Sequence, residues 1–152
     1  MASEGNSPLY WHNVDRLNRQ DDRAAAHLFS ASFLRYTISR SHGNTNPRLP
    51  IYLFVIGELV DAYENHYIPH IERVRMVLHM KFFKSIRKSF LQASHYPEHR
   101  YFISADADDI IDTLIDGLLG LIFIHWDHLQ MVFPLLPWMH GSEPNEHVFG
   151  LL

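Results

Sequence analysis

The clearest pattern in the chain is an amphipathic repeat between His70 and Ser94. At about 100° per residue, one side of a helix collects apolar side chains. These are Ile71, Leu78, Phe82, Ile86 and Phe90. The roughly opposite side collects basic side chains, which are Arg73, Lys81, Lys84, Arg87 and Lys88. The pattern predicts a helix whose apolar side faces the core and whose basic side faces solvent.

Two helices are predicted before this one. The first spans residues 14–40, can be capped by Asn13 or Asp15, and is followed by a loop at 41–47. The second spans residues 51–65. Its apolar run also fits a buried strand, but its length and the helical spacing of its acidic residues favour a helix.

Two more helices are predicted after it. One spans residues 105–131, is capped by Ser104, and is apolar nearly all round at its centre, which is typical of a helix buried among others. A last helix begins after Ser142 and reaches Leu152 in mid-pattern, so we expect a truncated part of a larger protein. Loops at 94–104 and 132–141 separate these segments.

Together these elements predict an all-α fold, an irregular bundle of four to five helices. The length of 152 residues favours a single helical domain, at residues 13–152, after a flexible segment at residues 1–12. The composition, 47% hydrophobic and 20% charged, argues against a disordered chain. The absence of cysteine excludes disulfides, thiolate metal sites and cysteine nucleophiles, and favours an intracellular location in the nucleus or cytoplasm.

Charge is divided unevenly along the chain. Residues 1–100 hold all 13 basic residues and nine of the 17 acids, a net charge of +4, whereas residues 101–152 hold eight acids and no Lys or Arg, a net charge of −8. This asymmetry indicates a polarised surface or two parts that neutralise each other. The most apolar run, residues 117–126, is too short to cross a bilayer, so no membrane association is expected.

Twelve histidines raise the question of a metal site. The candidate groups are the pairs His66/His70 and His125/His128 and the set His140, Glu146 and His147. Imidazole and carboxylate groups bind zinc, and the line Asp109, Asp112, Asp116 could hold magnesium. No known metal signature surrounds them, so structural or surface roles are favoured, with no metal and no cofactor.

Nucleotide-binding and hydrolase motifs are also missing from the sequence. Gly117 and Gly120 form a GLLG run inside an apolar helix, which indicates close helix packing rather than a phosphate loop. The residues therefore predict no enzyme and no small-molecule substrate.

Three stretches resemble a family of fungal proteins related to transposon-derived transposases of the hAT type. They are QDDRAAAHLFSASFL (20–34), LPIYLFVIGELVDAYENH (49–66) and LLPWMHGSEPNEHVFGLL (135–152). The segment from Ser142 to Gly150 is similar to the late motif of those enzymes, in which an acid and then an aromatic residue open a helix. Here the acid is Glu146 and the aromatic residue is Phe149.

The resemblance implies a helical insertion from a ribonuclease-H-like transposase. Such catalysis uses two metal ions held by three carboxylates. This chain has no strand-rich region to supply the other two, so Glu146 is interpreted as a relic. One hypothesis is a non-catalytic fragment that binds nucleic acid weakly through the basic helix at 70–94. The alternative is a helical protein-interaction module with no nucleic-acid role, whose partner covers the apolar C-terminal segment.

Overall fold

The protein is all-α, as predicted. A computed structural model describes residues 27–40, 48–129 and 133–140, which contain four helices of ten residues or more and no strand. The described residues belong to two compact units, residues 1–60 and 61–152, and the boundary lies inside one helix. The single domain expected at residues 13–152 stays a prediction.

The first unit contains α2 (Ala31–Arg40) and most of α3 (Arg48–Glu64). The prediction of one continuous helix over residues 14–40 is wrong, because the chain turns at Phe29 and Ser30. Ser30 explains the break. Its hydroxyl oxygen lies 3.3 Å from the backbone nitrogen of Phe33 and accepts its hydrogen bond, which is the contact of a helix N-cap.

Phe33 and Leu53 form the buried centre of this unit, and Leu28, Phe29, Leu34 and Tyr36 pack against them. Gly57 allows the chain to approach α3 closely. A Cβ atom at this position would lie only 2.7 Å from the carbonyl oxygen of Phe29. The apolar run of α3 is thus a helix and not a strand, as predicted, and its glycine is a packing requirement.

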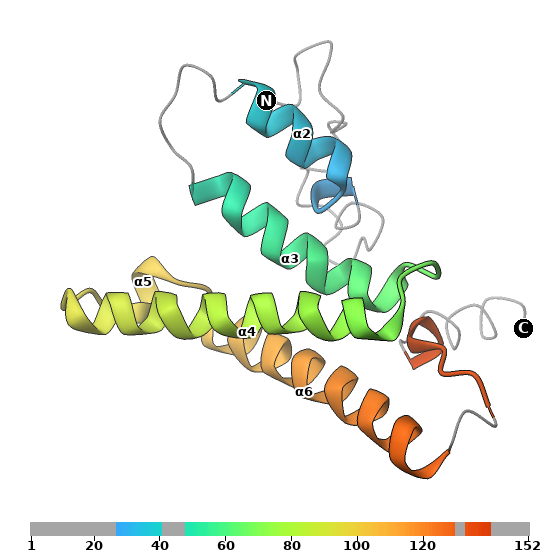
Figure 1. Ribbon diagram of the computed structural model, residues 1–152. Helices are drawn as coiled ribbons and strands as arrows, with labels where there is room; N and C mark the ends of the chain where they lie inside the picture. The colour runs from blue at the N-terminus through green and yellow to red at the C-terminus, as the bar shows by residue number, and fades with distance from the viewer. Residues whose placement is uncertain (1–26, 41–47, 130–132, 141–152) are drawn as a thin grey trace, which may run out of the picture. The chain divides into compact units, whose positions relative to one another are not determined.

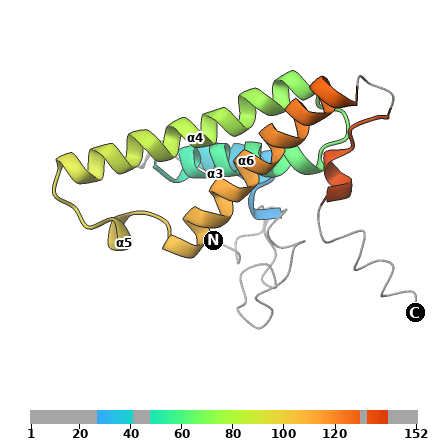
Figure 2. The same ribbon diagram turned by 90° about the horizontal axis from the view of Figure 1, so that it is seen from below.

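The second unit contains α4 (His70–Ala93), the one-turn helix α5 (Glu98–Tyr101), α6 (Ala105–His128) and the 3₁₀ turn η3 (Pro137–His140). Figures 1 and 2 show α4 and α6 side by side, running in opposite directions. Ser104 caps α6 by accepting a hydrogen bond from the backbone nitrogen of Ala107, as predicted. The predicted bounds of α4 agree with the structure within one residue.

The core of this unit comes from one stripe on each long helix. On α6 the buried residues alternate at spacings of four and three, which places them along one face. They are Ile111, Ile115, Leu118, Ile122 and His125. On α4 the buried apolar residues are Met76, Val77, Met80 and Leu91. Outside its buried stripe, α6 exposes large apolar side chains, among them Ile110, Phe123 and Trp126.

This arrangement corrects the predicted orientation of α4. Ile71, Phe82, Ile86 and Phe90, which we expected in the core, are exposed, whereas Arg73 and Lys84, which we expected on the outer face, are buried. α4 has two apolar stripes, and the stripe that contains Met76 and Met80 is the one that packs against α6. The carboxylates of α6 then draw Lys84 inward, because a buried carboxylate requires a cation.

Two expectations for α6 are also wrong. The helix is buried along one side only, and it ends at His128 rather than residue 131. Gly120 does not mediate close packing, because a Cβ atom there would meet nothing within 4 Å. The predicted flexible segment at 1–12 and the predicted last helix after Ser142 lie outside the described residues.

Candidate functional site

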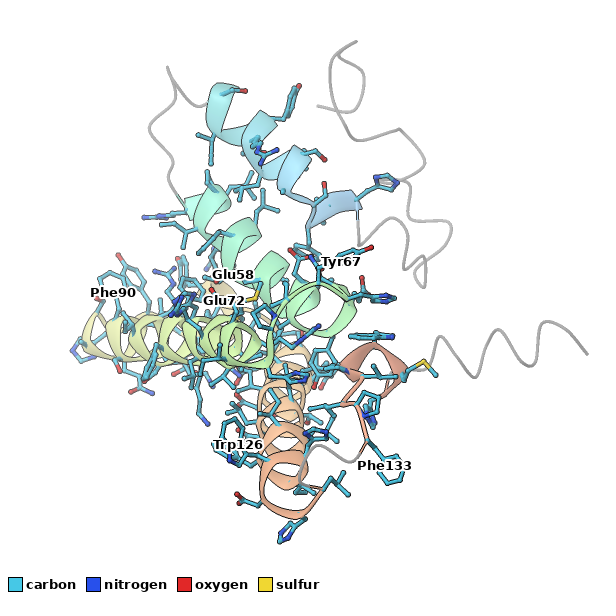
Figure 3. The ribbon with its side chains drawn as sticks, turned by 45° about the vertical axis from the view of Figure 1, so that its right-hand side comes forward. Glu58, Tyr67, Glu72, Phe90, Trp126 and Phe133 are labelled. Carbon is cyan, nitrogen blue, oxygen red and sulfur yellow. The ribbon has the colours of Figure 1, made fainter. Side chains whose placement is uncertain are left out.

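The second unit exposes aromatic and arginine side chains where α4 ends and α5 follows. We call this surface the α4–α5 patch. It consists of Ile86, Arg87, Phe90, Tyr96, Arg100 and Tyr101. Ile86 is 70% exposed and Phe90 is 53% exposed. Figure 3 shows Phe90 near the end of α4 that is remote from Trp126 and Phe133. Interfaces are enriched in such residues, so the patch is the candidate site.

The end of α4 places the aromatic residues. His95 has a φ of 56°, in the left-handed region. The backbone nitrogens of His95 and Tyr96 donate to the carbonyls of Gln92 and Leu91, at 3.1 and 2.9 Å. These two bonds form a Schellman motif, in which the residue after the left-handed position packs back on the helix. The motif therefore turns Tyr96 toward α5, and its ring centroid lies 5.0 Å from that of Tyr101.

Arg87 links the two helices of the patch. Its Nη2 donates to the carbonyl of Tyr101 at 3.2 Å, and its guanidinium lies over the ring of Phe90 at 5.5 Å. Its Nε is buried and has no hydrogen-bond partner among the described residues. A second guanidinium, that of Arg100, lies 5.7 Å from the ring of Tyr101. The patch thus alternates flat apolar surfaces with cations that are not matched by a carboxylate in these contacts.

A shallow hollow of about 230 Å³ lies within this surface. Its lining residues are Phe83, Ile86, Arg87 and Phe90, all on α4. The lining is almost wholly apolar, with Arg87 as its one charged member. Such a hollow suits an apolar side chain of a partner better than a polar metabolite, because few polar groups are present to fix the orientation of a small molecule.

Two of the predicted nucleic-acid-binding residues, Lys84 and Lys88, instead bind α6. The Nζ of Lys84 lies 2.7 Å from carboxylate oxygens of both Asp108 and Asp112, and Lys88 pairs with the other oxygen of Asp108. Burial raises the pKa of Asp108, but hydrogen bonds from Lys84 and Lys88 outweigh this effect and hold the pKa below its usual value. The hydrogen bond to Asp108 raises the pKa of Lys88 in turn.

Arg73 is the most buried of the predicted cations, at 1% exposure. Its guanidinium donates to the carbonyls of Ile68, Ala62 and Asn65, and so satisfies the end of α3 and the turn that follows. Lys81 is exposed and lies 3.1 Å from a carboxylate oxygen of Asp116. Of the five predicted residues, Arg87 alone is also a member of the α4–α5 patch.

The predicted histidine groups are only partly brought together. The rings of His70 and His125 lie 6.1 Å apart, from α4 and α6. The ring of His66 stacks on Trp138 instead, and His128 is exposed on α6. Within the described ranges, no set of three or more histidine, aspartate or glutamate side chains could hold a metal ion. Glu146 and His147 lie outside the described residues.

Sequence reasoning missed the aromatic part of the patch. Tyr96, Arg100 and Tyr101 lie in the predicted loop at 94–104, where no periodicity draws attention to them. Their signal was compositional, since two tyrosines and an arginine flank Pro97 within six residues. Ile86 and Phe90 were noticed but assigned to the core.

Comparison with protein-family models, with curated proteins and with solved structures finds no match for this chain. Among the residues described here, no helix is both long enough and apolar enough to cross a membrane. A functional proposal for this protein therefore depends on the chemistry of the α4–α5 patch.

Proposed function

We propose that this protein is a non-catalytic helical module that binds other proteins through the α4–α5 patch. The observation that supports the proposal is the exposed run of Ile86, Phe90, Tyr96 and Tyr101 beside two guanidinium groups. Tyrosine and arginine dominate binding energy at protein interfaces, since they combine large apolar contact with directed hydrogen bonds. The patch differs from the apolar C-terminal segment of the alternative hypothesis. In that segment Trp138 stacks on the ring of His66, and residues 141–152 lie outside the described residues.

The partner we propose is an amphipathic helix with acidic residues beside its apolar stripe. Its apolar side chains would occupy the hollow at Phe83, Ile86 and Phe90, as in the helix-in-groove mode of recognition. Its carboxylates would meet Arg87 and Arg100, whose contacts with other described residues are to rings and a backbone carbonyl. A guanidinium forms its best hydrogen bonds with a carboxylate, so an acidic helix fits this surface better than a basic one.

Binding to nucleic acid through α4 has weaker support. Arg73 and Lys84 are buried, and Lys81 and Lys88 pair with aspartates of α6. Phosphate contacts require cations that can exchange their counterions for the nucleic-acid backbone. Four of the five cations assigned to this role are thus held by groups of the protein itself.

The relationship to hAT-type transposases belongs to the proposal as the origin of the module. Under this hypothesis the chain is a helical insertion that has lost its catalytic role, and Glu146 performs no metal chemistry. Purified protein should therefore cleave no DNA strand with magnesium or manganese. Metal-dependent nicking that Glu146→Ala abolishes would overturn the non-catalytic part of the proposal.

The binding proposal can be tested by fluorescence polarisation with labelled peptides. The probes are a panel of acidic amphipathic helices with leucine or phenylalanine anchors, each paired with a scrambled peptide of the same composition. We expect the amphipathic peptides to bind and the scrambled ones to bind at least tenfold more weakly. Phe90→Ser and Ile86→Ser should each weaken binding about tenfold or more, the size of effect seen for anchor residues.

Phe123→Ser is the matched control, because Phe123 is a similarly exposed aromatic residue on α6, outside the patch. It should leave peptide affinity unchanged. Failure of every amphipathic peptide to bind would overturn the proposal, as would equal losses from Phe123→Ser and Phe90→Ser. A single-stranded oligonucleotide that binds with steep salt dependence, and loses affinity in Phe90→Ser, would also overturn it and assign the patch to nucleic acid.

A further inference from the structure

Helix α6 has a second line of side chains beside its buried one. Each member follows a buried residue of α6 by one position, so the line lies about 100° around the helix from the contact with α4. We call it the α6 stripe, and it consists of Asp112, Asp116, Leu119, Phe123 and Trp126. Phe123 is 61% exposed and Trp126 is 70% exposed, so this side of α6 offers two large rings to a partner.

Acidic groups accompany these rings. Asp127 is exposed and lies about one turn after Phe123 on α6. The side chain of Asp116 is also largely exposed, although Lys81 lies 3.1 Å from one of its oxygens. Helix α6 contains six aspartates and no lysine or arginine. It is thus an acidic amphipathic helix with exposed apolar side chains, which is the kind of partner proposed for the α4–α5 patch.

The α4–α5 patch complements the α6 stripe in charge. The patch offers the guanidinium groups of Arg87 and Arg100 beside an apolar hollow, whereas the stripe offers carboxylates beside exposed rings. Hydrogen bonds between a guanidinium and a carboxylate are about twice as strong as those between neutral groups. Aromatic side chains and arginine are also the residues that most often anchor protein interfaces.

The two surfaces lie at opposite ends and on opposite faces of the α4–α6 pair. Phe90 lies near the end of α4 and Trp126 near the end of α6, and the two helices run in opposite directions (Figures 1 and 3). Phe83 and Phe90 of the hollow each precede a buried residue of α4 by one position, whereas the α6 stripe follows the buried line of α6. Opposite offsets on antiparallel helices point to opposite faces of the pair. The patch therefore cannot bind the α6 stripe of its own copy.

We propose that the partner of the α4–α5 patch is α6 of a second copy of this chain. Phe123 and Trp126 of one copy would supply the apolar anchors, and Asp116 and Asp127 would meet the arginines of the other copy. This inference rests on the proposed function, since it names the occupant of that same surface. It requires no rearrangement of the unit, because both surfaces are exposed in it.

The placement of the two surfaces determines the kind of assembly. Each copy uses its patch toward one neighbour and its α6 stripe toward another, so the contact is heterologous. Heterologous contacts build rings or open chains, whereas a two-fold pair would need both surfaces on the same face. One helix side against one patch is a small interface, and small interfaces are weak and transient. Self-association should therefore depend on protein concentration.

Sedimentation of the full chain, from about 10 μM to about 1 mM, tests the inference at concentrations suited to a weak contact. We expect the mean mass to rise with concentration and to pass that of two copies. Phe90→Ser in the patch and Phe123→Ser in the α6 stripe should each weaken self-association about tenfold or more, as expected for anchor residues. Circular dichroism should show the same helix content in both variants, because both side chains are exposed.

Ile124→Ser is the matched control for Phe123→Ser. Ile124 is the next residue of α6 and is also exposed, but it precedes the buried His125 and so lies on the other flank of the helix. This variant should associate like the parent.

A mixture of the two defective variants tests the contact directly. Phe90→Ser retains an intact α6 stripe, and Phe123→Ser retains an intact patch. An equimolar mixture should therefore form pairs, and growth should stop at two copies because the two remaining surfaces are defective. A saturating acidic amphipathic peptide that binds the patch should dissociate both these pairs and the assemblies of the parent.

The inference is refuted if the parent stays a single copy over the whole range while the peptides bind its patch, a result that leaves the proposed function standing. It is also refuted if the parent assembles but the mixture forms no pairs, or if Phe123→Ser and Ile124→Ser associate equally. If neither the peptides nor a second copy binds, the inference and the proposed function both fail.

Discussion

At the residue scale, two glycines that both lie inside helices have different surroundings and opposite roles. Gly57→Ala would place a Cβ atom 2.7 Å from a backbone oxygen, whereas Gly120→Ala would meet nothing within 4 Å. Alanine is preferred over glycine in a helix by up to about 1 kcal/mol. Overpacking against a backbone that cannot yield costs about 1–3 kcal/mol.

The overpacking cost exceeds the propensity gain, so we expect Gly57→Ala to lower the free energy of unfolding by up to about 2 kcal/mol. Gly120→Ala should raise it by up to about 1 kcal/mol. Urea denaturation followed by circular dichroism measures both. Stabilisation by Gly57→Ala would contradict the close approach of Phe29 to α3.

His95 offers the reverse case, a side chain at a position that favours glycine. Its φ of 56° costs a residue with a Cβ atom about 1 kcal/mol or more relative to glycine. His95→Gly should therefore raise the free energy of unfolding by about 0.5–1 kcal/mol. His95→Ala keeps the Cβ atom and should change stability little, so thermal unfolding of the two variants separates the backbone effect from loss of the imidazole. Equal effects of the two variants would argue against the Schellman motif at the end of α4.

At the element scale, the contact of α4 with α6 depends on one buried cation. Lys84 is 4% exposed and lies between Asp108 and Asp112, while Lys81 makes an exposed pair with Asp116 one turn earlier. Removing one partner of a buried pair costs about 3–5 kcal/mol, because the other charge is left without compensation. Removing one partner of an exposed pair costs at most about 1 kcal/mol.

Lys84→Ala should thus destabilise the protein by about 2–4 kcal/mol, somewhat less than a fully buried pair because Lys88 still reaches Asp108. Lys81→Ala, the control on the same helix, should cost less than about 1 kcal/mol. Chemical denaturation of both variants measures the two losses in the free energy of unfolding. Similar losses would show that Lys84 is solvated in the native protein.

Helix α4 shows which features of the fold can be predicted from the sequence and which cannot. Periodicity and the Ser104 cap predicted the existence and bounds of α4 and the start of α6, because these depend on local hydrogen bonds and local spacing. Periodicity could not tell which of the two apolar stripes of α4 faces inward. That choice depends on α6, whose aspartates draw Lys84 into the contact and leave Ile86 and Phe90 outside. The α4–α5 patch escaped prediction for the same reason, since its exposure is a consequence of a partner element.

At the scale of the whole molecule, basic residues from the first 100 positions form ion pairs with acidic residues from the last 52. Lys81, Lys84 and Lys88 come from the basic part of the chain and meet aspartates of the acidic part. The expectation that the two parts neutralise each other is met at this contact. Among the described residues of the second unit, the cations outside the patch either pair with carboxylates or, like Arg73, are buried. The surface that this unit offers to a partner is therefore more aromatic than its count of basic residues suggests.

The lowered pKa values of His70 and Asp108 together predict a two-step loss of stability in acid. The pKa of His70 is lowered chiefly by burial, and the pKa of Asp108 is lowered by its two lysines against the effect of burial. A lowered pKa in the folded state means that the unfolded chain binds protons first, so both groups favour the folded state at neutral pH. The contribution of His70 is lost as the pH falls below about 6.5, and that of Asp108 as it falls below about 3.9.

Urea denaturation at a series of pH values resolves the two steps through variants. His70→Gln should flatten the difference in unfolding free energy between pH 7 and 5 relative to the parent. Asp108→Asn should lower stability at pH 7, because the amide carries no charge to pair with the two lysines. It should also reduce the further loss below pH 4, because an amide does not titrate there. If both variants keep the parent's dependence on pH in both windows, His70 and Asp108 do not control the acid response.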